Sequence, residues 1–373
     1  MGYSKGLKQY DTIVIGAGIV GAACAWRLQA LGQRVLVLDV NMPGTGATAE
    51  CMGHIVVMDD SPAQFALCRY SRSEWLELLP SMPQGCEASR CGTLWVAADE
   101  DEMQAVRRKE QLYNEAGIAC EVLDRNSLRN HEPNLRADLT GGLRVPDDLT
   151  VYPTNCTNWF LRAVEVQTGV EVVRVREHEV TDARQNRYLS DNVIVAAGGL
   201  SSELVPELPI SPRKGHLVIT ERAEGFCSHQ IVELGYLKSA HQMESESVAF
   251  NIQPRTTGQM LLGSSREFCG WDRSINRSIV KKMIARGIEY MPALAELPAI
   301  RIWTGFRPCT KDKLPLIGAW PAMAGVYIAA GHEGLGITTS LGTAELVASA
   351  ICGAQPAFDP LPYAPGRALE ATS

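Results

Sequence analysis

The sequence has no block of lysine and arginine residues, no CxxC cysteine pair, no internal repeat and no low-complexity tract. A net charge of −7 without a basic block argues against binding to nucleic acid or to an anionic membrane surface. The 11 cysteines are scattered and odd in number, which disfavours a disulfide framework, a zinc site or an iron–sulfur cluster. We therefore expect buried free thiols in a reducing compartment, and no metal.

We also expect neither a signal peptide nor a transmembrane segment. Residues 1–10 are largely polar, and the apolar run after them contains a glycine turn, which is typical of a strand followed by a helix. We expect a cytoplasmic protein. The 373 residues exceed the roughly 250–300 that one hydrophobic core usually serves, so we expect two structural units.

Residues 12–39 carry the most informative motif. An apolar strand, the turn GAGIVG at 16–21, a helical pattern and a second strand ending at Asp39 follow one another. The first glycine permits a tight turn, the second lets backbone amides approach a pyrophosphate, and the third allows close helix–strand packing. A carboxylate at the end of the second strand can accept both ribose hydroxyls. The motif predicts dinucleotide binding.

The periodicity of the remaining chain predicts further elements. Helical patterns occupy residues 61–79, 99–117, 153–168 and 275–290. Strand patterns occupy residues 90–96, 170–180 and 325–331, and residues 191–201 read as a buried strand that runs into two glycines. Regular alternation over residues 213–266 predicts an antiparallel sheet, one face of which can cover a ligand. A glycine loop at 331–338 leads into a final helix.

Several motifs together resemble a known family. After GAGIVG and Asp39 come GTGAT at 44–48, VIVAAGG at 193–199, GFRPCTKDKLPLIG at 305–318 and GHEGLGIT at 331–338. The chain is similar, over nearly its whole length, to the flavoprotein superfamily of D-amino acid oxidase, glycine oxidase and sarcosine oxidase. Strings such as VELGYLKSAH and FNIQPRTTGQ most resemble bacterial D-hydroxyproline dehydrogenases.

The resemblance implies an α/β fold with two domains. The first is a Rossmann-like, GR2-type FAD-binding domain, and the second is an α+β substrate domain on a mostly antiparallel sheet. We expect residues 1–80, 145–205 and 300–373 to form the FAD-binding domain, and residues 81–144 and 206–299 to form the substrate-binding domain.

The resemblance also implies non-covalent FAD, because sarcosine oxidases carry a flavin-linked cysteine where this chain has Arg307. We expect the cofactor to contact residues of the glycine motifs and of the segments that follow the strands. These are Gly16, Gly18, Ile19, Val20, Gly21, Asp39, Val40, Asn41, Thr45, Gly46, Ala47, Thr48, Gly53, His54, Ala197, Gly198, Gly331, His332, Gly334, Leu335, Gly336, Ile337 and Thr338.

Four residues are candidates for the chemistry. Arg307 offers a planar fork that can pair with a substrate carboxylate, and Trp303 and Phe306 flank it with apolar bulk. Tyr236 is a candidate to assist that carboxylate, with core packing as the alternative. His54 and His332 are candidates near the flavin, each equally consistent with a structural role. His216 we expect to be structural.

The resemblance implies oxidation of a Cα–H next to an amine, and we expect the reaction to convert cis-4-hydroxy-D-proline to a pyrroline carboxylate. The alternatives are a related glycine or D-amino acid oxidase, or the catalytic subunit of an opine dehydrogenase. A different class is a flavin-binding subunit of a larger electron-transfer complex. The expected partners are an amino acid and an electron acceptor such as a quinone, a dye-like carrier or oxygen, and the chain could form a homo-oligomer.

Overall fold

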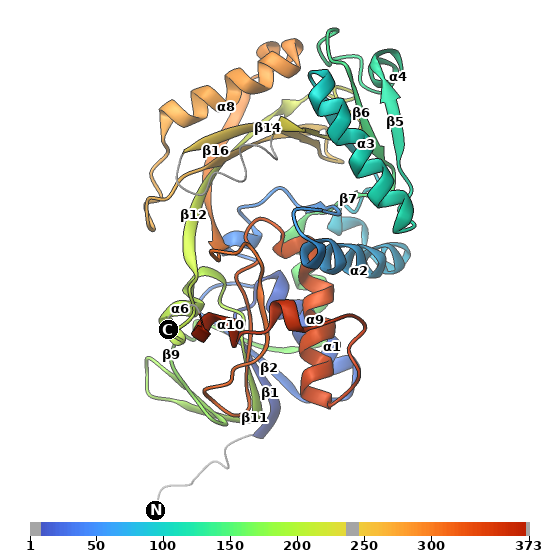
Figure 1. Ribbon diagram of the computed structural model, residues 1–373. Helices are drawn as coiled ribbons and strands as arrows, with labels where there is room; N and C mark the ends of the chain where they lie inside the picture. The colour runs from blue at the N-terminus through green and yellow to red at the C-terminus, as the bar shows by residue number, and fades with distance from the viewer. Residues whose placement is uncertain (1–8, 236–245, 371–373) are drawn as a thin grey trace, which may run out of the picture.

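The computed structural model describes residues 9–235 and 246–370, and it contains two large sheets, one below the other in Figure 1. The first sheet has the strand order β17-β18-β11-β1-β2-β8. Its strands are parallel except for β17, and the hairpin of β9 and β10 extends from β11. The bounds are β1 (Gln9–Ile15), β2 (Val35–Asp39), β8 (Glu165–Thr168), β9 (Val172–Arg176), β10 (Glu179–Asp182), β11 (Arg187–Val195), β17 (Leu316–Ala319) and β18 (Val326–Ala330).

Helices pack against one face of this first sheet. The bounds are α1 (Ile19–Ala30), α2 (Pro62–Leu78), α5 (Pro153–Leu161) and α9 (Gly336–Cys352). Helices α1 and α9 lie side by side in Figure 1, and their buried alanines and leucines share one core with α5. Strands buried on both faces read as continuous apolar runs, which is the pattern of β1 and β2.

The second sheet has the order β16-β12-β15-β14-β13-β4-β6-β5. Its pairs are antiparallel except that β13 runs parallel to β4. Two helices cover its opposite faces, α8 against Phe250 and Ile252, and α3 against Trp95 and Val232. The bounds are β4 (Thr93–Ala97), β5 (Glu121–Asp124), β6 (Gly141–Val145), β12 (Ser211–Arg222), β13 (Gln230–Glu233), β14 (Ser247–Pro254), β15 (Gln259–Arg266), β16 (Ala299–Cys309), α3 (Glu100–Glu115) and α8 (Arg277–Tyr290).

Shorter elements complete the described part of the chain. They are the paired strands β3 (His54–Ile55) and β7 (Leu149–Thr150), and the helices α4 (Arg125–His131), α6 (Ser201–Leu204) and α10 (Arg367–Glu370). Within the described part of the chain, every helix is too short or too polar to cross a bilayer. All eleven cysteines are free thiols, but Cys352 is exposed at the end of α9, so the expectation of uniformly buried thiols was wrong there.

The structure confirms most predicted helices. Helix α2 begins where Ser61 accepts a hydrogen bond from the backbone of Gln64, with a proline in its first turn. Asp99 caps α3 in the same way through the backbone of Glu102. Helices α8 and α9 also lie where the sequence predicts them.

The predicted helix over residues 153–168 was wrong in its second half. Helix α5 ends at Leu161, and residues 165–168 form β8, which pairs with β2. The chain changes period there: Val164 and Val166 both face the core, whereas Glu165 between them is exposed. That alternation is typical of a strand, and a helical pattern read across the boundary hides it.

Residues 170–180 form a hairpin and not the single predicted strand. Strands β9 and β10 pair through a turn at Glu177 and His178, and His178 has a left-handed backbone with φ 60°. No glycine, asparagine or proline marks this turn, so the sequence carries none of the usual turn signals.

The expected antiparallel sheet over 213–266 is present as β12, β13, β14 and β15, with β13 much shorter than the sequence pattern around it. Tyr236 lies outside the described residues. Strand β16 belongs to the second sheet, although it falls almost entirely after the expected domain boundary at residue 300. Beyond that strand, the division into two domains stays a prediction.

Candidate functional site

A cavity of about 640 Å³ runs between the two sheets. Its walls are the carboxyl ends of β1, β2 and β11, the segments 45–54 and 196–200, and parts of β12, β14, β15 and β16. All described residues predicted to contact the cofactor line this cavity, except Gly21, Gly331, Leu335 and Thr338. The cavity therefore brings together motifs that are far apart in the sequence.

The turn at residues 16–21, which forms part of the cavity wall, requires glycine at two positions. Gly16 has φ 106°, and a Cβ there would lie 2.4 Å from the carbonyl oxygen of Ala196. A Cβ on Gly21 would lie 2.0 Å from the carbonyl oxygen of Gly16, so Gly21 serves helix–strand packing and does not line the cavity. Gly18 is the N-cap of α1, whose first turn has no acidic residue.

Asp39 ends β2 beside this turn. Its carboxylate accepts hydrogen bonds from the backbone N–H of Ala17 at 2.6 Å and of Asn41 at 2.7 Å. Asp39 lines the cavity, and both of its carboxylate oxygens already accept a hydrogen bond from a backbone N–H. Each oxygen has a second lone pair that can accept a further hydrogen bond.

Thr338 and His54 join the final helix to the segment after GTGAT. The hydroxyl of Thr338 donates to the carbonyl of His54 at 3.0 Å and accepts from the N–H of Val56 at 3.2 Å. Burial lowers the pKa of His54 to about 4, so its ring is neutral at pH 7. Thr338 thus supports the site from behind the cavity wall.

His332 and Glu333 lie in the turn before α9. Nε2 of His332 hydrogen-bonds Oγ1 of Thr343 at 2.9 Å, and burial lowers the pKa of His332 to about 3. Glu333 has φ 48°, and its N–H donates to the carbonyl of Pro308 at 2.8 Å. His332 therefore combines a lining position with a structural hydrogen bond.

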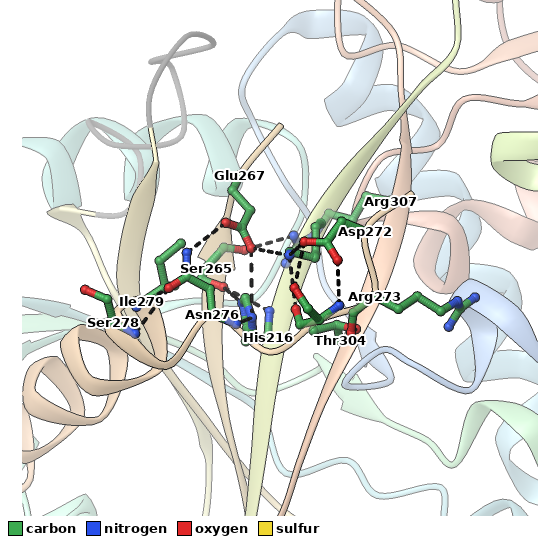
Figure 2. A network of polar contacts seen from close by, with 12 residues as sticks. His216, Ser265, Glu267, Asp272, Arg273, Asn276, Ser278, Ile279, Thr304 and Arg307 are labelled. Carbon is green, nitrogen blue, oxygen red and sulfur yellow. Dashed lines mark hydrogen bonds and ion pairs between the residues drawn. The ribbon is translucent and has the colours of Figure 1, made fainter. Parts of the chain in front are cut away.

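Arg307 points into the cavity from β16. Its guanidinium reaches across β12 and donates from Nη1 to the carbonyl oxygen of Ser265 at 3.0 Å, as Figure 2 shows. Gly215 leaves room for the guanidinium, since a Cβ there would lie 2.4 Å from that same nitrogen.

Burial acts to raise the pKa of Glu333, but the nearby guanidiniums of Arg307, Arg266 and Arg213 hold this pKa below its usual value.

Sequence reasoning missed the segment between β15 and α8. Trp271 and Arg273 from this segment line the cavity, and Arg273 forms an ion pair with Glu50 at 2.6 Å. A Cβ on Gly199 would lie 2.6 Å from the ring of Trp271. The string CGWDR at residues 269–273 could have indicated this part of the site, because it places a tryptophan between glycine and charged residues in a loop.

Polar contacts hold this segment to the second sheet (Figure 2). Lys214 Nζ lies 2.9 Å from Glu267 Oε1 and 3.3 Å from Asp272 Oδ2. The backbone N–H of Asn276 donates to Nε2 of His216 at 3.0 Å, so that ring is neutral and its Nδ1 donates to Ser265 Oγ. His216 does not line the cavity, in agreement with a structural role.

Comparison with known proteins decides the family. A family model described as "DAO: FAD dependent oxidoreductase" matches residues 11–350. The chain belongs to this family. Glycine oxidase of Pseudomonas aeruginosa is 26% identical to this DAO-family chain, covering 96% of the chain and 99% of the relative.

Two solved structures show the same fold as this DAO-family protein. Glycine oxidase from Geobacillus kaustophilus superposes with a TM-score of 0.86 at 22% identity, covering 95% of this chain and 98% of that one. L-proline dehydrogenase from P. horikoshii gives a TM-score of 0.88 at 20% identity, covering 98% and 99%. The α/β fold with a Rossmann-like sheet and a mostly antiparallel second sheet is therefore confirmed.

FAD, the cofactor of this family, fits the residues present. Helices α1 and α9 both begin at the cavity without an acidic residue in the first turn and without a side-chain cap. The positive ends of their dipoles favour negative charge, such as a pyrophosphate or an anionic flavin ring, and at the start of α1 the N–H of Ile19 already donates to Oγ1 of Thr48 at 3.1 Å. The residues around Gly16, Asp39 and Thr48 would hold the adenosine diphosphate half, and those around His54 and Gly334 the flavin half.

Proposed function

We propose that this protein oxidises the Cα–N bond of a small amino acid to an imine, with cis-4-hydroxy-D-proline as the substrate and a pyrroline carboxylate as the product. FAD, when bound, supplies the capacity to accept a hydride equivalent from carbon. The family supports the redox chemistry, and the resemblance of strings such as VELGYLKSAH supports the substrate. The FAD is proposed to be non-covalent, since Arg307 stands where sarcosine oxidases carry a flavin-linked cysteine and the neighbouring Cys309 does not line the cavity.

The single observation that carries the proposal is the position of Arg307. Its guanidinium lies at the cavity wall, fixed by the carbonyl of Ser265 and by the space above Gly215. A guanidinium presents a planar fork to a carboxylate, and a charge-assisted contact of this kind contributes about 1.5–3 kcal/mol. Arg307 would therefore bind the carboxylate of the amino acid and fix the direction of its Cα–H bond.

The remaining candidate residues have supporting roles in this proposal. His54 and His332 are neutral at pH 7 because burial depresses the pKa of each, so neither adds a positive charge beside the amine. A substrate amine that binds in its neutral form needs no dedicated protein base. Tyr236 is proposed to assist the carboxylate. We also propose a cytoplasmic location, with a quinone, a dye-like carrier or oxygen as the electron acceptor.

A substrate panel tests this function. The panel comprises D-proline, both 4-hydroxy-D-proline epimers, glycine, sarcosine and an opine, with oxygen consumption and dye reduction measured in parallel. We expect the fastest turnover with cis-4-hydroxy-D-proline and dye. Preference for glycine with oxygen would favour a glycine oxidase, as in the named relatives, and preference for an opine would favour an opine dehydrogenase. A purified flavoprotein without activity on any of them would favour a flavin-binding subunit.

A further inference from the structure

Two polar side chains of the second sheet, both in the cavity wall, each have a buried atom without a hydrogen-bond partner among residues 9–235 and 246–370. Asn251 on β14 and Ser264 on β15 both line the cavity, with only 8% and 5% of their surface exposed. Within the part of the chain that the structure describes, Oδ1 of Asn251 and Oγ of Ser264 make no hydrogen bond. A buried polar atom left unpaired destabilises the protein, so such groups in a ligand cavity point to a ligand that pairs with them.

The sheet places these groups beside the carboxylate anchor. Arg307 donates to the carbonyl of Ser265, the residue directly after Ser264 (Figure 2). Asn251 lies on the neighbouring strand, opposite Gly263. Ser264 is therefore adjacent in the chain to the residue that holds the guanidinium, and Asn251 lies one strand further on the same cavity wall.

Apolar side chains lie beside Gly263, which pairs with Asn251 and precedes Ser264. A Cβ on Gly263 would lie 3.0 Å from a methyl of Leu217 and 3.1 Å from the sulfur of Met52, and both of these side chains line the cavity. A polar group in an apolar wall discriminates strongly, because a ligand that cannot pair with it leaves it desolvated and unpaired.

We propose that Asn251 and Ser264 form a subsite that recognises a hydroxyl group on the substrate. This inference rests on the proposed function and specifies its substrate class: a small, cyclic amino acid whose hydroxyl and carboxylate lie on the same face of the ring. Arg307, Ser264 and Asn251 all face one cavity, so a cis substituent can reach the subsite while the carboxylate stays on Arg307. A trans hydroxyl points to the opposite face of the ring, and glycine has no group to offer.

The test compares two substrates in two variants of the FAD-loaded enzyme. In both Asn251→Ala and Ser264→Ala, we expect kcat/KM for cis-4-hydroxy-D-proline to fall about tenfold more than kcat/KM for D-proline, the loss of one hydrogen bond. Asn158→Ala, an exposed helix position outside the cavity, is the matched control and should leave the ratio as it is. The wild-type enzyme should prefer the cis over the trans epimer.

Equal losses for both substrates would overturn the subsite, because Asn251 and Ser264 would then serve the amine, the cofactor or the fold. No loss in either variant would also overturn it. Wild-type enzyme that oxidises neither proline would instead overturn the proposed function. The dissociation constants of the same two compounds, measured from the change in flavin absorbance, would then decide the subsite by the same tenfold criterion.

Discussion

Gly215 on β12 controls where the guanidinium of Arg307 can lie. A Cβ added at this position would lie 2.4 Å from Nη1 and 2.9 Å from Cζ of Arg307, both well inside contact distance. The backbone of Gly215 is held in the β12–β16 ladder opposite Gly305, so the flexible arginine side chain has to move. We expect Gly215→Ala to break the hydrogen bond from Arg307 to Ser265 and to displace the carboxylate anchor.

The magnitude follows from the contact that is lost. One charge-assisted contact of about 1.5–3 kcal/mol corresponds to a KM that is about 10- to 150-fold higher. The free energy of unfolding should change little, because alanine is the better strand residue by roughly 0.5–1 kcal/mol and only the end of one side chain is displaced.

The assay is steady-state dye reduction with the preferred amino acid, together with the thermal midpoint of the FAD-loaded protein. Gly85→Ala is the control, since Gly85 is exposed, does not line the cavity, and a Cβ there would approach its nearest atom at 3.4 Å. A Gly215→Ala enzyme with the KM of the Gly85→Ala enzyme would refute the assignment of Arg307 as the carboxylate ligand.

Three further predictions concern the cofactor and stability. Gly199→Ala should push Trp271 away from the cavity and speed FAD release, measured by recovery of flavin fluorescence, and an unaltered rate would speak against a covering role for Trp271. Burial lowers the pKa of His332 from 6.5 to about 3, so the neutral ring contributes fully to the free energy of unfolding above pH 6.5, and this contribution is lost as the pH falls toward 3, at up to about 1.4 kcal/mol per pH unit. In a series of denaturant titrations, the free energy of unfolding of His332→Asn should therefore fall less steeply below pH 6.5 than that of the wild type. The same steepness in both proteins would contradict this. Removing the side chain of Arg72, whose Nη1 lies 3.0 Å from the buried Asp148 carboxylate, should lower the free energy of unfolding by about 3–5 kcal/mol, because the carboxylate would be left buried and unpaired. A decrease below about 1 kcal/mol in a urea titration would show that the ion pair is dispensable for stability.

The sequence was sufficient for the parts of the site that depend on local backbone geometry. Gly16 must adopt a positive φ beside Ala196, and Gly21 must let a helix approach a strand. Both requirements place glycines at a fixed spacing in the sequence, where the motif can be recognised. The chain resembles its family most clearly in these same segments. The helices with a proline or a carboxylate at their start could be predicted for similar reasons.

The parts that failed depend on partners far away in the chain. Residues 165–168 become a strand because the edge of β2 is available to them. Asn251 and Ser264 have ordinary strand contexts in the sequence, and only the pairing of β14 with β15 brings them toward Arg307. Trp271 reaches the cavity because the loop that carries it is held by contacts on β12. Periodicity contains none of this information.

The most direct test of the central claim is anaerobic reduction of the protein-bound flavin by the amino acid. The wild-type protein should lose its visible flavin absorbance on mixing with cis-4-hydroxy-D-proline, and Arg307→Ala should need an amino acid concentration about 10- to 150-fold higher for the same rate. Bleaching of the Arg307→Ala protein at the wild-type concentration would contradict the claim that this guanidinium binds the substrate carboxylate.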